Sequence, residues 1–449
     1  MDFNRFKQAV IAAAEKLGVK EYELYYSSSE STDVGTFKHE INEFSSSVDG
    51  GVCFRCLVDG KMGYASTEAL NDAEAESVVA RAVENAKSLE SDDKQFLVAG
   101  GQKYQTIEKK SYPLPDTVKL VKTALDVDAA LYAAEPMIID GSQGGAGVSV
   151  GKIAIYNSNG LDLSYENSGS YFIAAAVVSQ NGEMSDSYEF RLGSLDGADI
   201  AGAVKKSVDD AKAMLGADVA PTGAYPVVFA PRAMASLLSV YSSAFSSENA
   251  QKGLSRLAGK EGQKIASDIV TIVDDPFYKD SAMPRNFDAE GSPTYTKNVI
   301  EKGVLKTLLY NLKTANVAGV KTTGNASKGS YSSSVGIKPF TFYIAPGDVT
   351  EEQLIEKAGN GVYITSLGGL HAGANAVSGD FSLQSSGFMI EDGKKTDKAV
   401  KSFTVAGNFY SLLGQITAIS DTVEKPRSGG STAFCSPAVL VEGLTVAGK

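Results

Sequence analysis

The sequence is poor in the residue types that build metal centres and redox sites. It contains two histidines, three cysteines and no tryptophan among 449 residues. The histidines, His39 and His371, lie far apart, so they do not have the spacing of a helical metal motif. Three cysteines cannot all pair within one chain, which fits a reducing cytoplasm. We therefore expect this chain to build no zinc site alone, and we assign it no catalytic residue and no metal ligand.

Long apolar runs and an excess of positive charge are missing too. No stretch approaches the roughly 18 apolar residues of a membrane-spanning helix. The N-terminal residues 1–6 do not form a basic region followed by an apolar one. A net charge of −12 argues against general affinity for nucleic acid, which requires clustered Lys and Arg. We expect a cytoplasmic protein that binds neither nucleic acid nor membrane.

The first half of the sequence repeats one order of elements. Helical apolar spacing at 3–17 and 72–89 flanks short strand patterns, which lie at 22–26, 36–41, 51–58 and 62–66. A second set has helices at 116–134 and 199–215 around strands at 147–156, 161–165, 171–180 and 185–191. This order predicts two similar α+β lobes or one duplicated sheet domain.

The second half has a different character. After Pro221 and Gly223 come a short strand at 225–230 and a helix at 232–245, and beyond residue 265 short strands alternate with turns. The predicted fold is therefore α+β, with N-terminal helices packed on antiparallel sheet and then a β-rich C-terminal domain. We place the domains at 1–218 and 219–449.

Several apparent motifs have ordinary explanations. The run that begins His39-Glu40 ends in Glu43 instead of a second histidine, and it lies in a strand-like context. Cys53 and Cys56 lie three apart on a predicted strand, so their side chains point to opposite faces and cannot share a metal. His371 follows Gly368-Gly369-Leu370 and is predicted to be an exposed loop residue.

Segments of the second half resemble the TldD/PmbA family, whose members include proteins named for DNA gyrase. The matching segments span roughly 170 residues in the family's order; they are Asp274-Asp275-Pro276, Phe287–Gly291, Thr322–Ala326, Gly379–Ser382, Gly387–Gly393 and Val405–Asn408. The resemblance implies a metallopeptidase-related protein that acts in proteolysis and peptide processing.

The family has two types of chain. TldD-like chains carry His-Glu-x-x-x-His on a helix and a cysteine near the C-terminus. Here the corresponding helix has Ser239, Val240 and Ala244 at those positions, whereas Cys435 stands at the position of the cysteine. Serine is a poor zinc ligand, and valine cannot act as a general base. The resemblance therefore implies a PmbA/TldE-type subunit, with zinc held by a TldD-like partner.

The resemblance also implies what such a subunit contributes. It would dimerise with a TldD-like chain, or with itself, and close a chamber that admits unfolded peptides. Strand addition would hold the backbone of an extended peptide without reading its sequence. As cavity-wall positions we name Asn325, Asp380, Asn408 and Cys435.

Two alternatives stay open at this point. The chain could be a stand-alone peptidase with a non-standard oxygen-ligand site, although such acidic clusters are more often solvated turns; the carboxylates in question are Asp274, Asp275, Asp288 and Glu290. It could instead be a non-enzymatic, homodimeric peptide-binding or adaptor protein. Peptide turnover by the isolated chain separates the first alternative from the subunit interpretation.

Overall fold

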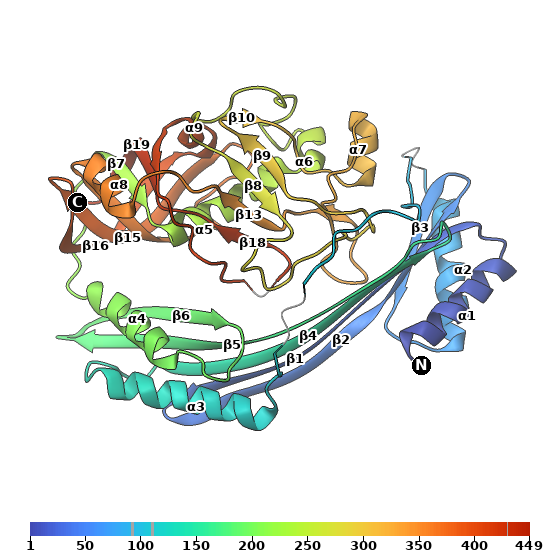
Figure 1. The fold of residues 1–449 in the computed structure, drawn as a ribbon, viewed down its shortest axis with the longest axis horizontal. Coiled ribbons are helices and arrows are strands. Elements are labelled where there is room, and N and C mark those ends of the chain that lie inside the picture. The colour runs from blue at the N-terminus through green and yellow to red at the C-terminus, as the bar shows by residue number, and fades with distance from the viewer. Residues whose placement is uncertain (91–93, 109–111, 429) are drawn as a thin grey trace.

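A computed structural model describes residues 1–90, 94–108, 112–428 and 430–449, and its first half forms one long antiparallel sheet (Figure 1). The strand order is β3-β2-β1-β4-β5-β6. The strands are β1 Glu21–Phe37, β2 Glu40–Val58, β3 Lys61–Thr67, β4 Gln143–Asn157, β5 Asp162–Gln180 and β6 Glu183–Leu192. Because β1 and β4, the first strands of the two sets, pair at the centre, the predicted repeat is one duplicated sheet.

Helices cover one face of this sheet at its two ends (Figure 1). They are α1 Phe3–Lys16, α2 Asp72–Ser88, α3 Thr117–Ala134 and α4 Ile200–Ala213. Each begins after an Asp or Asn whose side chain accepts a backbone N–H of the first turn. The α1–α2 pair and the α3–α4 pair each close a separate apolar core on the sheet. Within the described ranges, no helix has the length and apolar character needed to cross a membrane.

The other face of the sheet packs against the C-terminal half. Side chains alternate along each strand, so Leu24 and Phe54 join the core under α1 and α2. Tyr25 and Cys53 join a second core, which Phe287 of the C-terminal half completes. The predicted opposite orientation of the two neighbouring cysteines is confirmed, because Cys56 lies in the helix-side core.

The C-terminal half contains two larger sheets and one short hairpin, in the orders β10-β9-β8-β13-β18, β16-β15-β14-β7-β19-β17 and β11-β12. Their strands are β7 Gly223–Phe229, β8 Ile272–Asp275, β9 Lys297–Glu301, β10 Val304–Leu305, β11 Ala326–Ser327, β12 Gly336–Ile337, β13 Thr341–Ile344, β14 Gly361–Gly368, β15 Asp380–Glu391, β16 Lys394–Asn408, β17 Ile416–Ile419, β18 Ala433–Cys435 and β19 Val439–Ala447. The helices are α5 Pro231–Tyr241, the 3₁₀ helix η1 Ser242–Phe245, α6 Ser247–Gln251, α7 Leu312–Ala318, α8 Glu351–Ala358 and α9 Phe409–Gly414. The predicted α+β class with a β-rich C-terminal region is confirmed.

One local prediction about the first hairpin is wrong. Residues 36–41 do not form one strand, because the chain reverses at Lys38 and His39, whose φ angles are 53° and 67°. The serine-rich segments on either side lie outside the predicted strand ranges, and they belong to β1 and β2. Ser31 and Ser47 face each other across β1 and β2, with their hydroxyl oxygens 3.0 Å apart. A continuous ladder of backbone pairs holds these polar stretches in the sheet without an apolar core.

Candidate functional site

The segment to which the resemblance assigns the zinc motif of TldD-like chains is α5 with the start of η1. Ser239 and Val240 lie on its partly exposed face, whereas Ala244 lies in η1 and is buried. The Ser239 hydroxyl donates to the carbonyl of Ser236 at 2.8 Å, so it is bonded to its own helix. From Pro231 to Ser247 the chain has no histidine and no glutamate. These side chains do not fit zinc, which prefers imidazole, thiolate and carboxylate ligands.

Cys435 lies beside this helix, on β18, which packs against α5. Its side chain is buried, and burial raises the pKa of the thiol to about 12, with Glu424 adding to the effect. A thiol with this pKa stays protonated at neutral pH, so it is neither a ready nucleophile nor a ready metal ligand. In the described part of the chain, no group of three His, Cys, Asp or Glu side chains has a metal-binding arrangement.

Asp380 and Asn408 face each other across β15 and β16. The Asn408 amide donates to the Asp380 carboxylate and to the Ser378 carbonyl, each at 2.8 Å. Tyr241, the last residue of α5, donates its hydroxyl to the Asp380 carbonyl at 2.8 Å. These two predicted wall residues therefore lie together and connect to the end of α5, while Asn325 and Cys435 lie elsewhere.

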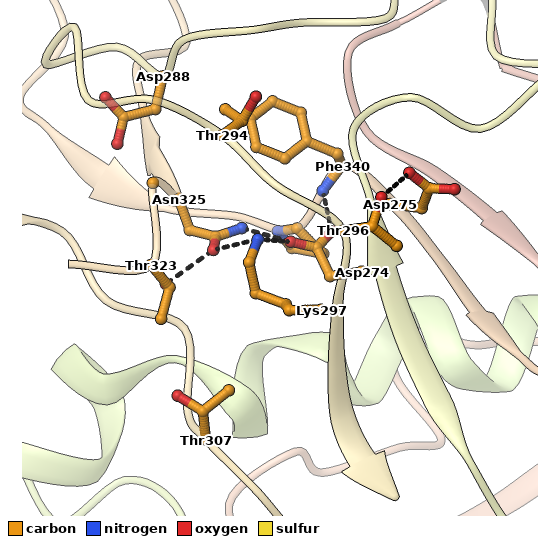
Figure 2. Close-up of polar contacts among 12 residues, drawn as sticks. Asp274, Asp275, Asp288, Thr294, Thr296, Lys297, Thr307, Thr323, Asn325 and Phe340 are labelled. Carbon is orange, nitrogen blue, oxygen red and sulfur yellow. Dashed lines mark hydrogen bonds and ion pairs between the residues drawn. The ribbon is translucent and has the colours of Figure 1, made fainter. Parts of the chain in front are cut away.

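Asn325 is the centre of a buried polar network (Figure 2). Its amide donates to Asp274 at 2.7 Å, and its carbonyl oxygen accepts from Lys297 at 3.2 Å and from Thr323 at 2.7 Å. The Lys297 ammonium also contacts the Asp274 carboxylate at 3.0 Å, and the backbone N–H of Phe340 donates to it at 2.7 Å. The network therefore fixes the segment that leads into β11.

The four carboxylates considered as an oxygen-ligand site are not solvated turns. Asp274, Asp288 and Glu290 are buried, and each has protein partners. Asp288 accepts the backbone N–H groups of Glu290, Ser292 and Ala326, each at 2.9 Å. The Asp275 carboxylate accepts the Thr296 hydroxyl at 2.7 Å. In Figure 2 the Asp288 carboxylate lies apart from Asp274 and Asp275.

An open groove lies at the C-terminal end of the α5–η1 segment. Its volume is about 320 Å³, within the range of about 300–1,000 Å³ of ligand-binding pockets. Polar side chains from η1, α6 and the β11–β12 region dominate its lining, which includes Ser243, Ser246, Glu248, Asn249, Ser327 and Lys338. The sequence prediction missed these residues. The available signal was the run of serines at 236–247, which continues the polar face of the helix into the groove.

The other sequence candidates lie away from the groove. His39 is in the β1–β2 turn, where its Nδ1 contacts the Asp128 carboxylate at 2.9 Å and its ring lies 4.1 Å from that of Tyr132. His371 is exposed in the turn after β14. Cys53 and Cys56 are buried free thiols. None of these four side chains, the two histidines and the two cysteines, lines the groove.

Buried carboxylates where the N-terminal sheet meets the C-terminal half make stability depend on pH. Burial raises the pKa of Glu23 and Glu290 against the lowering effect of Arg55, and burial with the Glu290 charge raises the pKa of Asp288 to about 7. A carboxyl whose folded pKa exceeds its unfolded value binds protons more tightly in the native state. The stability it contributes is therefore lost as pH rises from about 4 towards 7.

We expect the free energy of unfolding to fall by about 1–3 kcal/mol between pH 5 and pH 7.5, because these carboxyls ionise while buried. Urea unfolding followed by circular dichroism at several pH values measures this slope. Asp288→Asn is expected to flatten the slope, and Glu301→Gln at an exposed position is the control. A slope that Asp288→Asn leaves unchanged would contradict the assignment to this carboxyl.

Models of one protein family match most of the chain. Models described as PmbA/TldA metallopeptidase domain 1, central domain and C-terminal domain match residues 22–86, 109–215 and 222–448. The fold and these matches define a metallopeptidase-related protein. The chain belongs to the PmbA/TldD family.

Relatives and solved structures of similar length agree. An uncharacterized protein of Methanocaldococcus jannaschii is 28% identical, covering 97% of this chain and 98% of its own. The metalloprotease PmbA of Escherichia coli is 23% identical, covering 99% and 96%. A proposed modulator of a DNA gyrase from Thermotoga maritima has a TM-score of 0.89 at 29% identity, covering 99% and 100%. TldE from Thermococcus kodakarensis has a TM-score of 0.87 at 25% identity, covering 98% and 100%.

Proposed function

We propose that this chain is a non-catalytic, PmbA/TldE-type subunit of a cytoplasmic metallopeptidase system. It binds unfolded peptides and completes a proteolytic chamber with a zinc-bearing, TldD-like partner. The observation that carries the proposal is the composition of the α5–η1 segment, which has serine, valine and alanine where a zinc helix needs imidazoles and a general base.

The surroundings of α5 support a binding role. The groove beside it is lined by hydroxyl, amide and charged groups, and part of it is formed by the short hairpin β11–β12. Backbone groups at a strand edge can pair with an extended peptide of any sequence, whereas a folded domain offers no such free strand. This geometry selects for flexible chains and leaves the cleavage chemistry to the partner.

The first test of the proposal combines metal content with peptide turnover. The purified chain is equilibrated with excess zinc, desalted and analysed by mass spectrometry, and it is then mixed with unfolded, fluorescein-labelled casein. We expect a zinc ratio near zero and no cleavage by the chain alone. Cleavage is expected only after addition of a TldD-like subunit that carries the His-Glu-x-x-x-His motif, because only that chain supplies the metal site.

Two outcomes would overturn this assignment. Zinc bound near one per chain, and lost in Cys435→Ser, would mean that β18 contributes to an unexpected metal site. Cleavage of casein by the isolated chain would establish the stand-alone peptidase. A TldD-like subunit whose histidines are replaced is the control, since it retains the partner's surface without its metal.

A further inference from the structure

A small pocket lies where the N-terminal sheet meets the C-terminal half. Tyr25 of β1 and Ile153 of β4 line one side, and Phe340 lines the other. The pocket has a volume of about 40 Å³, enough for a few atoms, since one water molecule requires about 10–15 Å³ by the same kind of measure. It shares Ser327 and Lys338 with the larger groove, so the two spaces adjoin.

Three cationic side chains line this pocket: Arg285, Lys328 and Lys338. Among the residues that the structure describes, none of the three forms an ion pair with a carboxylate. The one carboxylate in the lining, Asp288, accepts three backbone N–H groups from its own surroundings. Positive charge therefore exceeds negative charge here, in a chain whose net charge is −12.

Arg285 is the most unusual of these residues. Its guanidinium lies 5.1 Å from the centre of the Tyr165 ring, and its Nε is buried without a hydrogen-bond partner. Burial lowers the pKa of Arg285, against the opposing effects of Tyr25 and Tyr165. A half-buried guanidinium whose Nε lacks a partner is costly, so the chain holds a charge that an anion would compensate.

We propose that this pocket binds an oxyanion, and that its source is the carboxylate of a peptide lying in the adjoining groove. Arginine and lysine bind carboxylate and phosphate groups through charge-assisted hydrogen bonds. The pocket is too small for an amino acid residue, but it admits a terminal or side-chain carboxylate. The groove on the other side of Ser327 and Lys338 has room for the residues that precede it.

This inference rests on the proposed function in one respect, which is that the ligand is a peptide. Binding is measured on the isolated chain, without zinc or a partner. A chain that fails to bind the carboxylate but still enables casein cleavage with its partner would sink this inference alone.

Isothermal titration calorimetry with one short acetylated peptide, Gly-Ser-Ala-Ala, as the free acid and as the C-terminal amide tests the proposal. We expect the free acid to bind at least about tenfold more tightly, and the preference to weaken with added salt. Arg285→Met and Lys338→Gln should each remove most of the preference. Lys321→Gln is the matched control, because this exposed lysine lies outside both spaces.

Inorganic phosphate and thermal unfolding complete the test. If phosphate competes with the free-acid peptide, the result supports the shared oxyanion chemistry. If phosphate binds but the chain has equal affinity for the free-acid and the amide peptide, the peptide is not the source of the oxyanion. Equal affinity for acid and amide without phosphate binding overturns the proposal entirely. Arg285→Met should not lower the unfolding midpoint, since it removes a half-buried charge that has no carboxylate partner. If that variant does not fold, Lys338→Gln, at an exposed position, carries the test.

Discussion

Replacing Lys297 with methionine is expected to lower the free energy of unfolding by about 3–5 kcal/mol, because it leaves a buried carboxylate without its cation. The Lys297 ammonium lies 3.0 Å from the Asp274 carboxylate, and the two side chains are 4% and 0% exposed. The remaining partners of Asp274 are neutral donors from Asn325 and Phe340. Urea unfolding of the wild type and the variant at pH 7 measures the difference.

A double variant separates the lost pair from the lost volume. Asp274→Asn with Lys297→Met removes both charges, so it should recover much of the stability that Lys297→Met loses. Lys306→Met is the control, because the Lys306–Glu301 pair is about half exposed and exposed pairs contribute about 0–1 kcal/mol. A Lys297→Met variant within 1 kcal/mol of the wild type, on the order of an exposed pair, would show that the network is not structural.

The same network shows what the sequence could not reveal about Asn325. Asn325 was predicted as a wall residue from its place in a family segment, but its amide is buried and bonded to Asp274, Lys297 and Thr323. These partners are far apart in sequence, so no local pattern reveals their contact. The neighbouring Ser327 lines the groove, whereas Asn325 itself does not.

The elements of the first half could be predicted because their signals are local. α2 and α3 begin one residue after Asn71 and Asp116, whose side chains cap them, and their apolar faces have clear helical spacing. The lengths of β1 and β2 could not be predicted, since serine-rich segments carry no strand pattern. The three cations of the small pocket were missed for a related reason. Arg285, Lys328 and Lys338 converge only after β11 and β13 are placed against the first sheet.

The second large effect is expected at two glycines, one in each copy of the duplicated sheet. A Cβ at Gly63 of β3 would lie 1.9 Å from the Ala82 carbonyl oxygen of α2. A Cβ at Gly144 of β4 would lie 2.2 Å from the Ala124 carbonyl oxygen of α3. Both glycines allow a helix backbone to lie directly on the sheet, and neither contact involves a flexible side chain that could move aside.

Gly63→Ala and Gly144→Ala should therefore each lower the free energy of unfolding by about 3 kcal/mol, because the helix must shift from the sheet and its core loosens. Gly151→Ala is the matched control in β4. The nearest atom to its Cβ, the Ser28 carbonyl oxygen, is 3.8 Å away, so a gain of about 0.5 kcal/mol is expected. Thermal or urea unfolding of the three variants measures these differences. If Gly63→Ala and Gly144→Ala are both costly and Gly151→Ala is not, a close helix–sheet contact stabilises both copies, at a different strand in each. If either variant matches the control, the close contact at that glycine does not stabilise the fold.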